Sequence, residues 1–150
     1  LCGTTPPPSC GTVYVARTAI RSFPMPQILV SYDASLDDVL DRRAFARELH
    51  AVAAETDDGI TVGGCRTRFQ RVEETVVGDD QPGQALVHLE CAILPGRTEV
   101  AKRALGAAVL DVLRRHTAAV PPGTVVHASV DVTELGTAYT AYKGPGGMGA

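Results

Sequence analysis

The chain has 150 residues, enough for one domain with a hydrophobic core, and its 45% hydrophobic and 21% charged residues are ordinary for a globular protein. Its formal net charge of -3 gives no general attraction to nucleic acid or to anionic membranes. No run of residues approaches the ~18 apolar positions of a membrane-spanning helix. We therefore expect neither nucleic acid nor a membrane as a partner.

Residues 1–24 differ in composition from the rest of the chain. They include the proline-rich stretch 5–9, which is typical of disordered or polyproline-like structure. The apolar segment 13–20 is short and is interrupted by Arg17, so it is a poor secretory signal. We expect residues 1–24 to be a disordered leader or an artefact of an upstream start, with the mature protein beginning after Met25. A transit peptide and a genuine extension are the alternatives.

The first half of the remaining chain predicts a strand, a helix and a second strand. The apolar run 27–32 predicts a strand that begins directly after Pro26. An amphipathic helix is expected over about 41–55, where the first residue, an aspartate, is placed to cap it. Residues 57–59 end this helix, and a strand follows over roughly 64–77. The apolar residues at helical spacing are Phe45, Leu49, Val52 and Ala53.

The second half repeats the same order. The run 85–93 predicts a strand, and Thr98 is placed to cap a long helix that extends to about His116. The last strand is expected over 124–130, and the glycine-rich residues 144–150 predict a flexible tail. The apolar stripe of the second helix comprises Ala101, Leu105, Ala108, Val109, Val112 and Leu113.

These elements predict two similar β-α-β units, joined by a hairpin turn over the turn-forming residues 78–83. The fold class is therefore α+β, with duplicated β-α-β units that form a four-stranded sheet and two helices on one face. Each crossover should be right-handed and should make its two strands parallel. The other face also needs cover, and its candidate apolar residues include Ile28, Val30, Val87 and Leu89, whichever parity faces away from the helices. We therefore expect this face to pack against other subunits in an oligomer.

The cysteines and histidines form no metal-binding pattern in the sequence. The four cysteines include no Cys-x-x-Cys pair, and the four histidines include no His-x-His or His-x-x-x-His pair. We therefore expect no metal ion. Reduced thiols in a cytoplasmic protein are the simplest interpretation of Cys2, Cys10, Cys65 and Cys91.

Pro26 is the first candidate for a chemical role. Inside a longer chain its nitrogen is a tertiary amide, whereas a chain cut after Met25 would expose a secondary amine. Burial and nearby arginines both disfavour the ammonium form and so lower the pKa of such an amine. A base tuned towards neutral pH can move a proton between two atoms of one substrate. Taken alone, a proline before a strand is more often a structural residue at a strand edge or turn.

Arg66 and Arg97 are the candidate substrate contacts. Arg66 lies in the segment 64–68, and Arg97 lies beside the expected start of the second helix. An arginine stays charged, binds a carboxylate through two N–H groups and stabilises a developing enolate oxygen. Each arginine taken singly is more often a solvated surface residue. Together with Pro26, they indicate an anionic substrate.

These segments resemble the tautomerase superfamily and, within it, the 5-carboxymethyl-2-hydroxymuconate isomerase family. Members of that family begin with Met-Pro and an apolar strand, as residues 25–30 do here. The resemblance covers about residues 25–143, which we take as the domain. The other matching segments follow in the order of the family: Gly64-Cys65-Arg66-Thr67-Arg68, Val87-His88, Gly96-Arg97, Glu134-Leu135 and Tyr142-Lys143.

The resemblance implies a homotrimer and a reaction that converts a dienol to its conjugated ketone in aromatic-acid breakdown, with no metal or cofactor. It implies Pro26 as an amino-terminal base. Arg66 and Arg97 would hold a small unsaturated 2-hydroxy or 2-oxo polycarboxylate. Two alternatives stay open. One is a related tautomerase with a different substrate, and the other is a non-catalytic, oligomeric ligand-binding module if residues 1–25 are retained.

Overall fold

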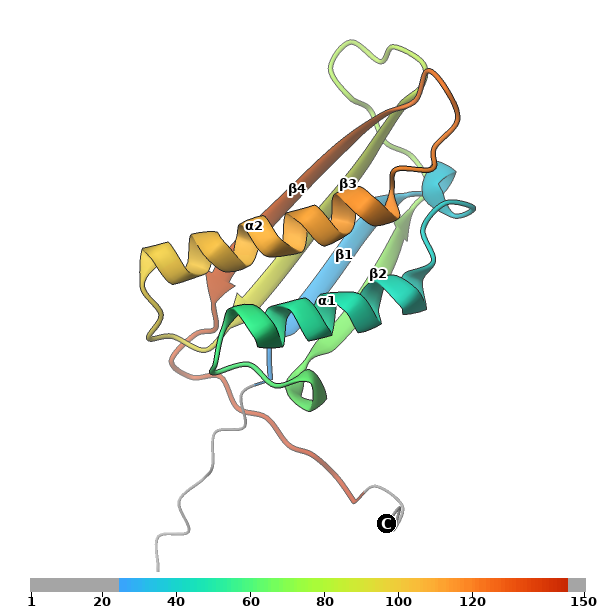
Figure 1. Cartoon of the computed structure of the whole chain (residues 1–150). Helices are drawn as coiled ribbons and strands as arrows, with labels where there is room; N and C mark the ends of the chain where they lie inside the picture. The colour runs from blue at the N-terminus through green and yellow to red at the C-terminus, as the bar shows by residue number, and fades with distance from the viewer. Residues whose placement is uncertain (1–24, 146–150) are drawn as a thin grey trace, which may run out of the picture.

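A four-stranded sheet with two helices on one face makes up the computed structural model, which describes residues 25–145 (Figure 1). The expected leader, residues 1–24, and residues 146–150 of the expected tail lie outside the described residues. The strands are β1 (Gln27–Asp33), β2 (Arg66–Val72), β3 (Gln84–Ile93) and β4 (Val125–Glu134). The helices are α1 (Arg42–Thr56) and α2 (Glu99–His116), and the single-turn 3-10 helices are Ala34–Leu36 and Val62–Gly64.

The strands lie in the order β2-β1-β3-β4. β1 pairs with β2 in parallel, and β3 pairs with β4 in parallel. The central pair, β1 and β3, is antiparallel. Each half of the chain is therefore one β-α-β unit, as the sequence predicted, and the two units join through their first strands in the middle of the sheet. The expected hairpin turn over residues 78–83 is wrong, because β2 and β3 are not neighbours in the sheet and β1 lies between them.

Two strands differ in length from the prediction. β2 ends at Val72, earlier than expected, because its partner β1 ends at Asp33, which pairs with Val72. Without a neighbouring strand, the backbone groups of the following residues have no ladder to join. β4 runs on to Glu134, beyond the expected end, because β3 offers it a partner along its whole length, as far as Ile93.

Side-chain caps begin both helices, as predicted. Asp41 Oδ1 accepts a hydrogen bond from the backbone N–H of Ala44 at 3.0 Å, and Thr98 Oγ1 accepts one from that of Ala101 at 3.1 Å. No helix within residues 25–145 is both long enough and apolar enough to cross a membrane. The helix residues buried against the sheet belong to the predicted stripes: Phe45, Leu49, Ala53, Leu105, Val109, Val112 and Leu113.

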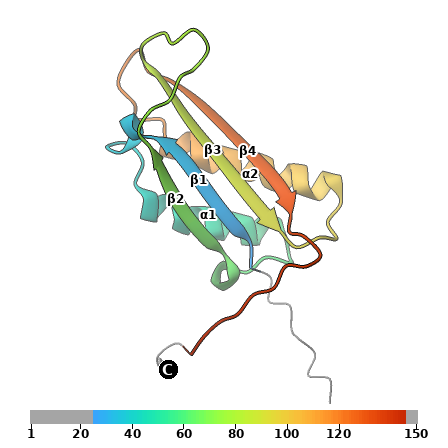
Figure 2. The same cartoon turned by 180° about the vertical axis from the view of Figure 1, so that it is seen from behind.

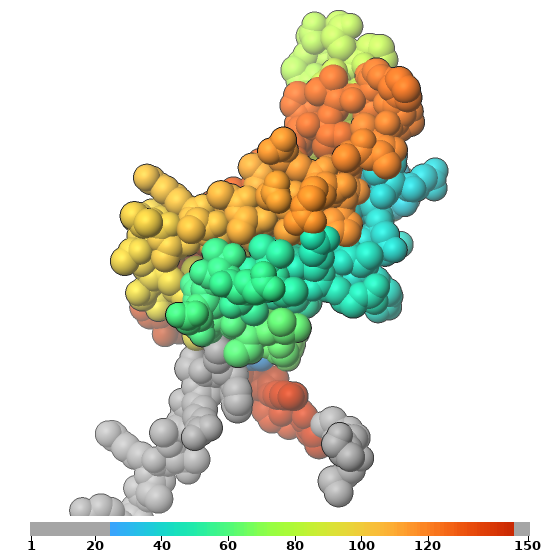
Figure 3. All heavy atoms as spheres, viewed as in Figure 1, coloured from blue at the N-terminus to red at the C-terminus, as the bar shows by residue number. Residues whose placement is uncertain are grey.

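The two helices lie side by side over the sheet, and Figure 3 shows their side chains in contact on this face. Glu48 of α1 connects them near the end of α2. Its Oε2 lies 2.5 Å from Nε2 of His116, and its Oε1 accepts a hydrogen bond from Arg115. The His116 ring also packs edge-on against Phe45. These contacts hold the helices together beside the core.

The hydrophobic core takes alternate residues of the two central strands. Ile28, Val30, Val87 and Leu89 are all at most 1% exposed and face the helices. These four residues were expected as candidates for the uncovered face, and that assignment is wrong. Successive side chains of a strand point to opposite faces, and these four share the parity that the helices cover.

The uncovered face of the sheet carries the opposite parity, and no helix of residues 25–145 lies over it (Figure 2). Leu29 is half-buried there, and Leu86 is 38% exposed. His88 Nδ1 lies 2.7 Å from Ser129 Oγ on the neighbouring strand. The other residues of this face are mostly polar: Gln27, Ser31, Arg68, Gln70, Glu90, His127 and Asp131. The expectation that an oligomer covers this face stays a prediction.

Candidate active site

The three predicted site residues all lie at one end of the sheet. Pro26 directly precedes β1, Arg66 is the first residue of β2, and Arg97 lies between β3 and α2. Because β3 runs antiparallel to β1, the starts of β1 and β2 meet the end of β3 at the lower end in Figure 1. The fold therefore places three residues that are far apart in the sequence at the same end of the sheet. Of the three, Arg66 lines the cleft described below, whereas Pro26 and Arg97 are not among its lining residues.

Pro26 is buried between the start of β2 and the end of β3. Its carbonyl oxygen accepts a hydrogen bond from the backbone N–H of Arg66 at 3.0 Å. The next residue, Gln27, pairs with Ala92 of β3. Both neighbouring strands therefore fix the position of Pro26. In a chain that continues through Met25, its nitrogen is an amide and has no usable basicity.

Arg66 lines an open cleft of about 660 Å³ beside the start of the sheet. Its Nη1 donates hydrogen bonds to the carbonyl oxygens of Gly63 and Cys65, at 2.8 and 2.9 Å. Within residues 25–145, no carboxylate forms an ion pair with Arg66 or Arg68. Their positive charge is therefore available to an anion. The cleft is lined by Met25, Gln27, Arg66, Thr67, Arg68, Tyr139, Thr140, Ala141 and Tyr142.

The segment that follows β4 forms the second wall of this cleft. The backbone N–H of Leu135 donates to the carbonyl oxygen of Ile93 at 2.7 Å, which ties the segment to the end of β3. Tyr139 Oη accepts a hydrogen bond from Gln27 Nε2 at 3.4 Å, and Tyr142 is 84% exposed. The sequence analysis assigned no role to Gln27 or Tyr139. Its only signal for this wall was the late Tyr142-Lys143 match.

Arg97 forms an ion pair with Asp57, the residue that ends α1. Its Nε donates to Asp57 Oδ2 at 2.9 Å, and its Nη2 donates to Oδ1 at 3.2 Å. Its Nη1 donates to the carbonyl oxygen of Leu94 at 2.8 Å. Only 16% of the Arg97 side chain and 11% of the Asp57 side chain is exposed. The Arg97 guanidinium lowers the pKa of the Asp57 carboxyl. The sequence analysis used Asp57 only as part of a helix stop and missed this pairing.

His50, Cys65 and Cys91 are uncharged near neutral pH. His50 Nε2 lies 2.7 Å from Thr67 Oγ1, and burial, followed by the charge of Arg66, lowers the pKa of His50. Burial raises the pKa of the Cys65 thiol and raises that of Cys91 to about 12. Both thiols are therefore protonated and poorly nucleophilic.

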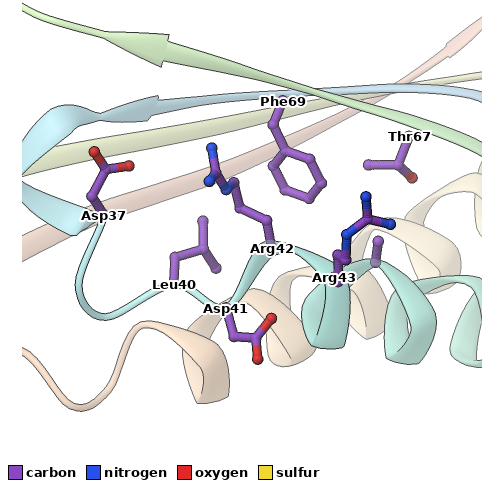
Figure 4. Close-up of a pocket in the computed structure, with 8 residues that line it drawn as sticks. Asp37, Leu40, Asp41, Arg42, Arg43, Thr67 and Phe69 are labelled. Carbon is purple, nitrogen blue, oxygen red and sulfur yellow. The ribbon is translucent and has the colours of Figure 1, made fainter.

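A second pocket, of about 600 Å³, lies between the start of α1 and β2 (Figure 4). Phe69 enters it from β2, and Arg42 and Arg43 enter it from α1. The hydroxyl of Tyr32 accepts a hydrogen bond from Arg42 Nη1 at 3.0 Å. None of the three predicted site residues lines this pocket. Its lining residues are Asp37, Leu40, Asp41, Arg42, Arg43, Ala46, Thr67 and Phe69.

A family model and a solved structure that match this chain carry the same family description. A family model described as 5-carboxymethyl-2-hydroxymuconate isomerase matches residues 26–145. A solved 5-carboxymethyl-2-hydroxymuconate isomerase from Deinococcus radiodurans R1 is 30% identical, with a TM-score of 0.71 over 82% of this chain and 92% of that chain. Among curated proteins, no sequence gives a significant match.

Two further solved structures share the fold at lower identity. A 5-carboxymethyl-2-hydroxymuconate delta-isomerase is 21% identical, with a TM-score of 0.69 over 81% of this chain and 90% of that chain. A fused 4-OT, described as a symmetric trimer, is 17% identical, with a TM-score of 0.54 over 69% of this chain and 84% of that chain. At these identities the likeness shows the fold alone.

Proposed function

The chain belongs to the 5-carboxymethyl-2-hydroxymuconate isomerase family, and we propose that it moves a proton within an unsaturated 2-hydroxy or 2-oxo polycarboxylate, without a cofactor. The observation that carries the proposal is that Pro26, Arg66 and Arg97 lie at the same end of the sheet. The family match also begins at Pro26 itself, which supports a base at the amino terminus. Such polycarboxylates are intermediates in the breakdown of aromatic acids.

Pro26 acts as the base when it is the first residue of the chain. Its nitrogen is then a secondary amine, which burial and the nearby guanidinium charges favour in the neutral form. The amine takes the proton from the hydroxyl group of the dienol. It then returns a proton to a carbon atom of the same substrate, so the O–H bond is replaced by a C–H bond and the hydroxyl becomes a ketone. The double bonds shift, and no atom is gained or lost.

The two arginines have different tasks in this proposal. Arg66 binds a substrate carboxylate in the open cleft, because no carboxylate of residues 25–145 neutralises it. Arg97 keeps one N–H group on each of Nη1 and Nη2 after its bonds to Asp57 and Leu94. Those two groups contact a second carboxylate or the oxygen that gains charge in the transition state.

A homotrimer would cover the open face of the sheet. The fused 4-OT of the same fold is described as a symmetric trimer. The open face exposes Leu86 and half-exposes Leu29 among polar residues, a composition that suits an interface between subunits. We place the trimer in the cytoplasm, because its Cys65 and Cys91 are free buried thiols.

The test compares two purified proteins, one that begins at Pro26 and one that retains residues 1–25. Each is assayed by ultraviolet absorbance for the conversion of 2-hydroxymuconate-type dienols to their conjugated ketones. We expect turnover only from the protein that begins at Pro26. Equal turnover by both proteins would contradict the role of Pro26. Turnover by neither would contradict the proposed reaction and favour the non-catalytic binding module.

A further inference from the structure

Asp57 is held in place by contacts other than the one with Arg97. Asp57 ends α1, and its backbone N–H donates to the carbonyl oxygen of Ala53 at 3.1 Å. Its Oδ1 accepts a hydrogen bond from the backbone N–H of Gly59 at 2.8 Å. The carboxylate therefore has an orientation set by the helix end and by the turn that follows. The Arg97 fork meets this fixed carboxylate through its Nε and Nη2 edge.

The turn after α1 also leaves room for the guanidinium. A Cβ atom at Gly59 would lie 2.4 Å from Arg97 Nη2, closer than atoms approach without moving. The φ angle of Gly59 is not among the positive values of the described residues, so its backbone does not itself require glycine. Glycine at position 59 therefore leaves the space that the Arg97 guanidinium occupies.

We propose that Asp57 is a positioning residue, which fixes the Arg97 guanidinium so that its two unused N–H groups meet the substrate. This inference rests on the proposed function, in which Arg97 is a substrate contact. Asp57 takes the edge of the fork formed by Nε and Nη2, and Leu94 takes one N–H of Nη1. Since three of its five donors are bound by the protein, the guanidinium cannot rotate towards solvent without losing them.

The ion pair between Asp57 and Arg97 gives the two arginines different electrostatic roles. Asp57 forms an ion pair with Arg97, whereas Arg66 has no carboxylate partner within residues 25–145. Arg66 therefore supplies attraction for an anion, and Arg97 supplies directed hydrogen bonds. An Asp57→Asn variant distinguishes these effects, because they change KM in opposite directions. Loss of the carboxylate charge would strengthen the attraction of Arg97 for an anion, whereas a loosened guanidinium would bind the substrate less well.

The experiment measures KM and kcat for the dienol with Asp57→Asn, in the form of the protein that is active in the assay above. Positioning predicts a KM about tenfold higher, which corresponds to about 1.4 kcal/mol of binding. If Asp57 served only to neutralise Arg97, the KM for an anionic substrate would fall. The matched control is Asp58→Asn, which removes the same charge from the neighbouring exposed residue and should leave KM unchanged.

Two further variants separate positioning from folding. In an Arg97→Ala background, Asp57→Asn should have no additional effect on KM, because the residue acts through Arg97. Gly59→Ala should raise KM without any change in charge, because its methyl group displaces Nη2. Each variant is checked by its melting temperature. A KM for Asp57→Asn equal to that of Asp58→Asn, or additive effects with Arg97→Ala, would overturn the proposal.

A binding measurement keeps this inference distinct from the proposed function. Calorimetry with muconate, a stable unsaturated dicarboxylate, reports the contact with Arg97 without turnover. If the wild-type protein binds muconate but does not convert the dienol, the proposed reaction fails, and a weaker affinity of Asp57→Asn still supports positioning. If the wild-type protein neither binds nor converts, both proposals fail.

Discussion

The backbone N–H of Arg66 donates to the carbonyl oxygen of Pro26 at 3.0 Å, so the first residue of β2 is fixed beside the residue that precedes β1. This bond extends the parallel pairing that begins at Gln27 and Arg66. A substrate that reaches the nitrogen of Pro26 therefore lies next to the cleft that Arg66 lines. Such a fixed arrangement favours catalysis, because little ordering is required when the substrate binds.

The first prediction concerns Pro26 in the protein that begins with it. Pro26→Ala should lower kcat by about 100-fold or more, which is the usual contribution of a positioned general base. The circular dichroism spectrum should be unchanged, because strand pairing begins only at Gln27. The control is Pro121→Ala, which changes an exposed proline before β4 and should leave kcat unaltered. Retention of wild-type kcat by Pro26→Ala would exclude Pro26 as the base.

The second prediction concerns Arg66. Arg66→Ala should raise KM by about 10- to 100-fold, because a charge-assisted bond to a carboxylate is worth about 1.5–3 kcal/mol. Arg66→Lys should restore only part of this affinity, since lysine keeps the charge but lacks the planar fork. Steady-state kinetics on the dienol measure both effects.

The control for Arg66 is Arg43→Ala, in the pocket between α1 and β2. This variant removes an exposed guanidinium of the same charge and should leave KM unchanged. A larger rise in KM for Arg43→Ala than for Arg66→Ala would show that the substrate binds in that second pocket instead.

The third prediction is a pH dependence of stability at Asp57. Its pKa is lowered from the ordinary value of 3.8, so the folded state favours the charged carboxylate. The stabilisation is therefore complete above pH 3.8 and is lost as the pH falls through the lower pKa of the folded state. Asp57→Asn should reduce the free energy of unfolding by about 1–3 kcal/mol near neutral pH.

Urea unfolding at several pH values tests this dependence. The difference between wild type and Asp57→Asn should shrink as the solution is made acidic, because both proteins then lack the carboxylate charge. Asp58→Asn serves as the control and should follow the wild-type curve. A difference that stays constant from neutral to strongly acidic pH would show that the pair with Arg97 is not its source.

The fourth prediction concerns the open face of the sheet. Leu86→Glu should convert the proposed trimer to smaller species in native mass spectrometry, because it would bury a charge at the interface. Val100→Glu is the control, since Val100 is 76% exposed on α2, away from that face. A wild-type protein that is monomeric at working concentrations would contradict the proposed trimer.

Much of the fold follows from local sequence patterns. The spacing of Phe45 and Leu49 marks the buried stripe of α1, and Thr98 marks the start of α2. These features were predictable because the period of a helix and the need to cap its first turn are properties of neighbouring residues. The parallel pairing within each β-α-β unit followed as well, since such a crossover makes its two strands parallel. The order of the four strands in the sheet did not follow from the sequence, which predicted a hairpin between β2 and β3.

The sequence by itself also identified Pro26, Arg66 and Arg97 as candidates, through residue type and order. Only the tertiary structure decided which face of the sheet received Ile28, because the parity of a strand relative to the helices depends on how the layers pack. Only the tertiary structure paired Arg97 with Asp57, which lies 40 residues earlier in the chain. No local pattern encodes such a contact, since the two side chains belong to different β-α-β units, which meet only when β1 pairs with β3.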